Sequence, residues 1–323
     1  MDGIPVEHPD TAPPPWPNQV LGFPPGARLL LVNCDDFGMH PAINAAVVES
    51  IEEGIAASCS LMTVCPAATD AMRLLRRHSA IPFGVHLTLV CESSHLRWGP
   101  LSPADTVPSL LDPSGTFFEP TPAGRAALLE RARTDEIETE FRAQIDAVAD
   151  AGLSPTHLDF HCLADGGRAD ILDLTVGLAA EYGLAVRVWL EPGRREMRRR
   201  GLPVVDHDFL DSFSLPAEGK AEHYRRLLHD LPAGLSEWAV HPAAGRGGRD
   251  PRRRAAGTPY GPCVPDIARG PGGRRTGGGH GDRLSVPATG LGAEHRSGLS
   301  PRYAYGARAT VFRNGCTAHP GAP

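Results

Sequence analysis

Long hydrophobic runs are missing from this sequence. Its 323 residues contain no uninterrupted run of 18 apolar residues, whereas a membrane-spanning helix needs about 20. Residues 1–25 are acidic and rich in proline, and they lack the basic and apolar regions of a secretory signal peptide. These absences argue against a membrane span, and we expect a cytoplasmic protein.

Paired cysteine motifs are also missing. The seven cysteines are an odd number and form no Cys-x-x-Cys pair. In a chain of this length, that pattern argues against a disulfide scaffold and favours a reducing compartment. Cys34 and Cys162 flank the polar segments described below, and we interpret both as small buried packing residues.

Lysine is almost absent, since Lys220 is the only one. The charges are unevenly distributed: residues 1–243 carry a formal charge of −15 and residues 244–323 one of +9, within a total of −6. The last 80 residues also contain 18 of the 36 glycines. Composition therefore divides the chain into a Pro-rich lead-in that we expect to be mobile (1–26), an acidic body (27–243) and a basic tail (244–323).

The body alternates between short aliphatic segments and segments of helical period. The first kind predicts strands, and the second kind predicts helices, one of which is residues 134–151 with Thr134 as a candidate N-cap. The expected strands are residues 28–33, 57–64, 81–89, 156–161, 185–190 and 237–240, and the other expected helices are residues 41–53, 67–78, 170–182 and 217–231. This order is typical of a parallel α/β sheet, open or closed into a barrel. A glycine-rich phosphate-binding motif is absent after the first strand, which disfavours nucleotide binding.

Ionisable residues recur at the carboxyl ends of these strands. Asp35 and Asp36 follow the first strand, His86 lies in the third, Arg187 in the fifth, and His241 closes the sixth. Active sites of parallel α/β proteins assemble at this edge of the sheet. We therefore predict a site there, in which one of the adjacent carboxylates binds a cation and the other acts as a base.

The fourth strand contains three polar residues in alternation. His157, Asp159 and His161 share one face because successive side chains of a strand point to opposite sides. Three titratable groups on a buried face are costly unless they bind something, and a metal offsets that cost. Asp36, His86 and a histidine of this strand would complete an Asp-His-His set with positions open for water and substrate. The spacing alone does not choose between His157 and His161.

The basic segments could suggest a nucleic-acid partner. We interpret residues 194–200 as a solvated helix face, because a Glu interrupts the arginines and no aromatic residues lie between them. The tail shows no sustained period, and glycine, arginine, proline and alanine are what GC-rich codons give in a wrong frame. Our hypothesis is that residues 244–323 are a frameshifted translation of the last strand–helix unit, with a genuine disordered tail as the alternative. No nucleic-acid partner is expected.

Four segments of the body resemble a known family. They are LLLVNCDDFGM (29–39), GVHLTL (84–89), PTHLDFH (155–161) and VHPA (240–243). Their order is similar to that of the YdjC/ChbG-like carbohydrate deacetylases, which include hopanoid-associated sugar deacetylases, over about residues 27–243. Two positions depart from the family: Cys34 stands where alanine is usual, and CLADG follows His161 where many members are rich in histidine.

The resemblance implies a distorted (β/α) barrel of the polysaccharide-deacetylase type, here incomplete at its C-terminal end. It implies hydrolysis of an N-acetyl group from an amino sugar with one divalent metal ion. It assigns roles to eight residues: metal ligands Asp36, His86 and His161, general base Asp35, general acid His241, and substrate-orienting or supporting His157, Asp159 and Arg187.

Several alternatives stay open. The body could be a sugar- or metal-binding barrel without catalysis, or another metal hydrolase such as a phosphoesterase. Two His and one Asp suit Zn²⁺ better than Mg²⁺, which is usually bound through oxygen. The sequence does not give the substrate sugar or the oligomeric state, and a homodimer is one option.

Overall fold

A computed structural model describes residues 17–208, 210, 219–243 and 310–312 of the chain. The predicted lead-in is therefore described only from residue 17, where a short helix α1 (Pro17–Val20) precedes the first strand. The frameshift and disordered-tail interpretations concern residues that lie outside the described part, apart from residues 310–312.

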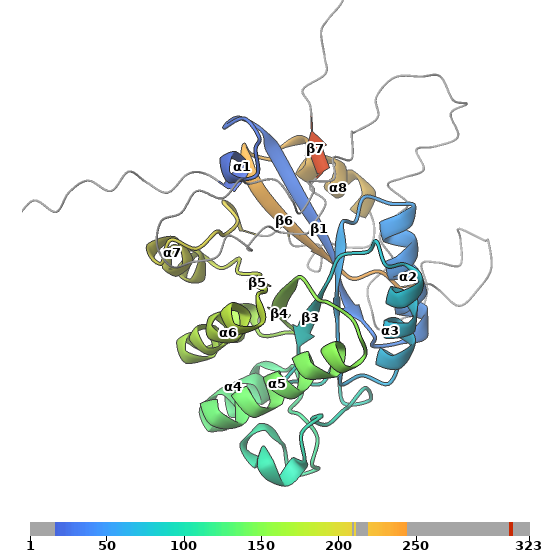
Figure 1. Ribbon diagram of the computed structural model, residues 1–323, viewed down its shortest axis with the longest axis vertical. Helices are drawn as coiled ribbons and strands as arrows, with labels where there is room; N and C mark the ends of the chain where they lie inside the picture. The colour runs from blue at the N-terminus through green and yellow to red at the C-terminus, as the bar shows by residue number, and fades with distance from the viewer. Residues whose placement is uncertain (1–16, 209, 211–218, 244–309, 313–323) are drawn as a thin grey trace, which may run out of the picture.

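Six parallel strands form a curled sheet, a half-barrel seen in Figure 1. In spatial order the strands are β5 (Ala185–Val186), β4 (His157–Phe160), β3 (Phe83–Leu87), β2 (Ser58–Leu61), β1 (Arg28–Phe37) and β6 (Gly234–Val240). A short strand, β7 (Thr310–Phe312), pairs antiparallel with the start of β1. The predicted distorted barrel is confirmed, and the described residues contain no seventh parallel strand.

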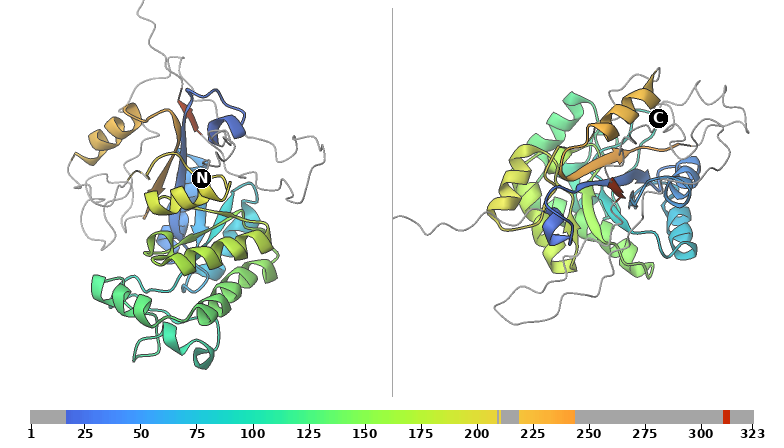
Figure 2. Two further views of the ribbon diagram at one scale, coloured as in Figure 1. Left: turned by 90° about the vertical axis from the view of Figure 1, so that its left-hand side faces the viewer. Right: turned by 90° about the horizontal axis from the view of Figure 1, so that it is seen from above.

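Helices cover the outside of this sheet, as the view from above in Figure 2 shows. They are α2 (Pro41–Glu52), α3 (Ala68–Arg77), α4 (Pro122–Arg131), α5 (Thr134–Asp150), α6 (Ala169–Tyr182), α7 (Glu191–Arg199) and α8 (Lys220–His229), with 3₁₀ turns at Ala104–Thr106, Pro108–Leu110 and Ala164–Gly166. None of these described helices is long and apolar enough to cross a membrane.

Apolar burial explains where these elements form. The first strand is buried along almost its whole length, as expected for a parallel strand covered on both faces. On α5, the buried side chains Ile137, Phe141, Ile145 and Val148 recur at helical spacing and pack toward the sheet side. The predicted N-cap was wrong by one residue, because Arg133 precedes the helix and the Thr134 hydroxyl instead donates to Asp170.

Three other sequence expectations need correction. The first strand continues to Phe37, so the paired aspartates lie inside it rather than after it. The fifth strand has only two residues, and Arg187 follows it. Residues 194–200 are only partly solvated: Arg194 is buried and donates to the carbonyl of Asp206.

The two edge strands of the half-barrel do not pair with each other. Asp206 and Leu210 lie along the free edge of β6 instead, where their backbone N–H groups donate to the carbonyls of Leu235 and Glu237. Across the remaining opening, Arg187 Nε donates to Glu237 Oε1 at 2.5 Å. A buried ion pair thus connects the two edges where a closed barrel would have strand pairing.

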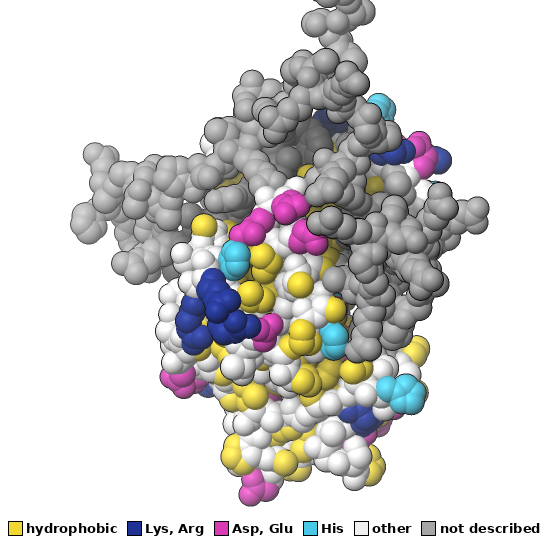
Figure 3. Space-filling view, turned by 90° about the vertical axis from the view of Figure 1, so that its right-hand side faces the viewer, with side chains coloured by type: hydrophobic (Ala, Val, Ile, Leu, Met, Phe, Trp, Pro, Cys, Tyr) yellow, Lys and Arg dark blue, Asp and Glu magenta, His cyan; other side chains and the backbone are white. Residues whose placement is uncertain are grey.

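The outer face over α2 and α3 is chemically mixed. Figure 3 shows one group of basic side chains there, with acidic and apolar groups around it. On α3 the basic residues are Arg73, Arg76 and Arg77; Arg73 pairs with Asp70, and Arg76 Nη2 donates to the carbonyl of Ala151 at 2.8 Å. This face shows no extended stripe of one charge.

Candidate metal centre

Two adjacent aspartates reach the same site because β1 is irregular where they lie. The pairing of β1 with β2 shifts register between Cys34 and Phe37, and Asp36 has a φ of 65°. A regular strand would point adjacent side chains to opposite faces. The irregularity turns both carboxylates inward, and a strained backbone of this kind is common at functional sites.

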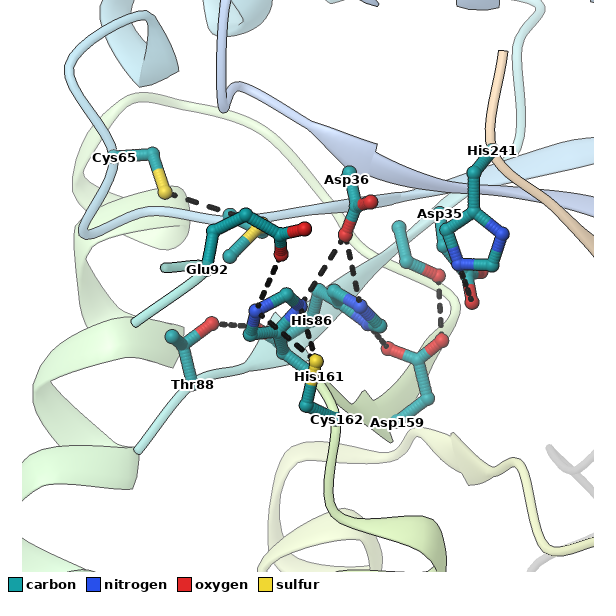
Figure 4. A network of polar contacts seen from close by, with 12 residues as sticks. Asp35, Asp36, Cys65, His86, Thr88, Glu92, Asp159, His161, Cys162 and His241 are labelled. Atoms are coloured by element: carbon teal, nitrogen blue, oxygen red, sulfur yellow. Dashed lines mark hydrogen bonds and ion pairs between the residues drawn. The ribbon is translucent and has the colours of Figure 1, made fainter. Parts of the chain in front are cut away.

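Asp36 faces two histidines. Its Oδ1 atom lies 3.3 Å from His161 Nδ1 and 3.6 Å from His86 Nε2, as Figure 4 shows. The other nitrogen of His86 contacts Asp159 Oδ1 at 2.8 Å. A carboxylate on the far nitrogen of a histidine fixes its ring orientation and tautomer, an arrangement that metal-binding histidines commonly use.

These three residues fit a metal ion. Their ligand atoms lie within 4.8 Å of one another, and all three side chains are buried. Asp36 Oδ1 is buried without a hydrogen-bond partner, and a buried carboxylate oxygen left in this state is costly unless a cation or another donor satisfies it. One oxygen and two imidazole nitrogens are ligands that Zn²⁺ accepts.

The electrostatics keep both aspartates ionised. Burial alone would raise the pKa of Asp36, but the favourable interactions with the imidazoles of His161 and His86 outweigh it and hold the pKa well below its usual value. Burial acts in the same direction on Asp35, and Arg187, with smaller contributions from nearby histidines, brings the pKa of that carboxyl below its ordinary value.

Arg187 connects three carboxylates at the centre of the site. Its Nη1 atom donates to Asp35 Oδ1 at 3.0 Å and also to Asp159, and its Nε atom contacts Glu237. The guanidinium is almost completely buried, and its carbon lies 5.5 Å from the ring centroid of Trp189. Arg187 therefore neutralises the charges that surround the candidate metal ligands and holds Asp35 in place.

Asp35 is held between this arginine and a more exposed histidine. Asn33 Nδ2 donates to Asp35 Oδ1 at 2.7 Å, and Asp35 Oδ2 lies 3.7 Å from His241 Nε2. The side chain of His241 is 27% exposed, whereas that of Asp35 is 7% exposed. The two groups lie at the boundary between the buried network and solvent.

His157 lies within the polar network but outside the metal cluster. Its Nε2 is 3.3 Å from Ser60 Oγ and its Nδ1 is 2.9 Å from Thr156 Oγ1. Gly84 packs against it, and a Cβ there would clash with the imidazole. Of the two histidines that the spacing left open, the structure places His161 beside Asp36.

We predict that His157 makes the protein less stable toward acid. Burial, aided by Arg187, lowers the pKa of His157 to about 3 in the folded state from an ordinary 6.5. Between these values the unfolded chain binds a proton that the folded chain does not, so stability falls as pH falls through this window. His157→Gln should reduce the slope of unfolding free energy against pH by up to ~1.4 kcal/mol per unit.

Urea unfolding of metal-free protein at pH 7, 6 and 5 measures this slope. His95→Gln, which changes an exposed histidine, is the matched control and should keep the wild-type slope. Equal slopes in wild type and His157→Gln would contradict the prediction.

Sequence reasoning missed several residues of the site. Ser60 donates to Asp159 at 2.7 Å, and Glu237 contacts Arg187. For Glu237, the sequence did contain a signal, since a charged residue inside an otherwise apolar strand indicates a buried polar partner. Cys162, expected to be buried, is exposed, and Glu92 from the loop after β3 lies 3.4 Å from His161.

Comparisons with known proteins bear on this site. A family model described as YdjC-like protein matches residues 29–259. A carbohydrate deacetylase of Brevibacillus brevis is 38% identical over 216 residues, 66% of this chain and 81% of the relative. One of Thermoanaerobacter pseudethanolicus is 31% identical over 216 residues, 67% of this chain and 81% of the relative.

A solved structure shows the same fold. It is a protein of Enterococcus faecalis, provisionally described as a cellobiose-phosphate cleavage protein, and it superimposes with a TM-score of 0.57 at 25% identity. The alignment covers 74% of this chain and 87% of that chain. Because the family model covers well over half of the sequence and both deacetylases are more than 30% identical to it, the chain belongs to the YdjC-like protein family.

Proposed function

We propose that this protein is a metal-dependent deacetylase that hydrolyses the N-acetyl group of an amino sugar. The names of its relatives support the reaction class. The observation that carries the proposal is the pair of adjacent aspartates. Asp36 faces two histidines with a buried oxygen that lacks a hydrogen-bond partner, while Asp35 beside it faces His241.

Asp36, His86 and His161 would hold the divalent metal, Zn²⁺ or Mg²⁺. Two imidazoles in a set of three ligands favour Zn²⁺. When bound, such an ion polarises a carbonyl group and lowers the pKa of water. The ring of His86 is held for this task by Asp159.

Proton transfer falls to Asp35 and His241. Asp35 stays ionised because Arg187 lowers its pKa, so it can accept the proton of the attacking water at its Oδ2 atom. His241 lies on the solvent side of Asp35, where its imidazole can donate a proton to the departing sugar nitrogen. Acetate and the free amine are the products.

The phosphoesterase alternative loses support from the geometry. In the sequence, Arg187 is the basic residue that left a phosphate substrate open. In the structure it is buried and engaged by Asp35, Asp159 and Glu237. Its charge is therefore already neutralised by this chain's own carboxylates.

Metal content and acetate release together test the proposal. The purified full chain should bind one divalent ion and release acetate from N-acetylated sugars, and a chelator should abolish the release. Asp36→Asn should lose the bound metal, because it removes the carboxylate that faces both histidines.

Asp70→Asn is the matched control, since it makes the same change at a carboxylate on the outer helix α3. It should retain metal and activity. Full metal content in Asp36→Asn, or acetate release that survives complete chelation, would refute the proposal.

A further inference from the structure

Two further ligand groups lie beside His161, at the ring nitrogen that does not face Asp36. Its Nε2 atom is 3.4 Å from Glu92 Oε2 and 3.5 Å from Cys162 Sγ. Figure 4 shows Glu92, His161 and Cys162 gathered at one side of the cluster. Carboxylate, imidazole and thiol each offer one ligand atom, and these atoms lie within 4.8 Å of one another.

The chain holds both added groups in position. Glu92 lies in the loop after β3, where its backbone N–H donates to the carbonyl of Leu96 and its neighbour Cys91 donates to the carbonyl of Phe118. The Glu92 side chain is 20% exposed, so a cation reaching it from solvent need not open the core.

Cys162 has an unusual backbone conformation. It follows His161 directly and has a φ of 56°, a left-handed value that is unfavourable for a residue with a Cβ. Among the described non-glycine residues, only Asp36 and Asp165 share a positive φ with it. Its thiol is exposed, unlike those of the other four described cysteines.

We propose that Glu92, His161 and Cys162 form a second metal site that takes a soft divalent cation such as Zn²⁺ or Cd²⁺. The thiolate ligand favours a soft cation over Mg²⁺, because Mg²⁺ prefers oxygen ligands whereas sulfur and imidazole bind softer ions. Three protein ligands also leave a position for water or another ligand.

The second site competes with the first for His161. A neutral imidazole has one nitrogen lone pair, and its other nitrogen bears a proton. A cation on Nε2 therefore leaves the proton on Nδ1, the atom that faces Asp36. Occupation of the second site withdraws His161 from the Asp36–His86 pair. For an enzyme of the proposed function, excess soft metal is inhibitory, whereas excess Mg²⁺ is not.

Cadmium binding tests the site without any activity assay. The metal-free full chain is titrated with Cd²⁺ while the ultraviolet charge-transfer absorbance of cadmium–thiolate bonds is recorded. Wild type should give a saturable signal that an equal concentration of Mg²⁺ does not displace. Cys162→Ser should abolish the signal. Glu92→Gln removes a charged ligand and should weaken binding by at least roughly 10-fold, the smallest usual cost of losing even a supporting partner of a metal site.

Two variants keep the test decisive. Cys162→Gly removes the thiol without strain, because glycine adopts a positive φ readily, and it should fold and lose the signal. The double variant Cys263→Ser/Cys316→Ser changes two thiols outside the described residues and keeps all three proposed ligands, so it should keep the signal. A wild-type signal in Cys162→Gly, or its loss only in the double variant, would overturn the proposal.

Asp36→Asn separates this site from the proposed catalytic centre. It disables the first metal set but leaves Glu92, His161 and Cys162 unchanged, so the cadmium–thiolate signal should persist. Loss of the signal in Asp36→Asn would show that the thiol binds only as part of the first site and would refute a separate one. If the protein released no acetate from any sugar, the cadmium result would still stand.

Discussion

Asp35→Asn should retain the bound metal and lower kcat for acetate release by about 10²–10⁴, the contribution expected of a general base. Asparagine has nearly the same shape as aspartate and can still accept the hydrogen bonds that Arg187 and Asn33 donate to Oδ1. It cannot accept a proton from water at neutral pH. The variant therefore removes one chemical property and leaves the architecture of the site in place.

Two measurements distinguish this outcome from general damage. Metal content and thermal stability of Asp35→Asn are compared with those of Asp36→Asn, which should lose the metal. The Asp35 variant should keep KM close to the wild-type value, because the defect is in proton transfer rather than in binding. A wild-type kcat in Asp35→Asn would remove Asp35 from the mechanism.

Much of this site could be predicted because a parallel sheet brings the carboxyl ends of its strands together. Asp36, His86 and His161 are far apart in sequence, yet the strand order β4-β3-β2-β1 places their strands in one continuous sheet. Alternation along β4 correctly put Asp159 and His161 on the same side. The choice of His161 over His157 came from the family resemblance and not from the spacing.

Two kinds of feature could not be predicted from the sequence: irregular backbone angles within the site, and contacts between residues far apart in the chain. No sequence pattern predicts the positive φ angles of Asp36 (65°) and Cys162 (56°). These backbone angles nevertheless decide where the two side chains point. The contact between Arg187 and Asp35 spans 152 residues and depends on how far the sheet curls. Local propensity contains no information about that curvature.

The predicted boundary after residue 243 also bears on closure. The family model matches up to residue 259, beyond the point at which the composition changes. The frameshift interpretation of residues 244–323 remains a prediction, and a nucleotide sequence of codons 243–248 tests it. In the described residues, the backbone contacts of Asp206 and Leu210 along β6 and the Arg187–Glu237 ion pair close the half-barrel, rather than a further parallel strand.

Arg187→Met should lower the free energy of unfolding by about 3–5 kcal/mol, the usual cost of leaving buried charge uncompensated. The change removes the guanidinium that contacts Asp35, Asp159 and Glu237. Burial already raises the pKa of Glu237, an effect that Arg187 partly offsets. Without the arginine, three buried carboxylates would face one another, and for a folded body of this size Tm should fall by roughly 6–20 °C.

A double-mutant cycle shows whether the ion pair itself closes the half-barrel. Glu237→Gln should lower the free energy of unfolding by less than Arg187→Met does. It removes one carboxylate from a cluster of three and leaves the arginine paired with two aspartates. Since the two side chains are in contact, the combined variant should deviate from the sum of the single losses by about 0.5–3 kcal/mol. The loss of unfolding free energy in Arg187→Met should also become smaller toward acidic pH, because protonation neutralises the carboxylates that the arginine had balanced. Additive losses that do not change with pH would mean that the contact between the edge strands does not stabilise the fold, and that packing along β6 alone holds the opening together.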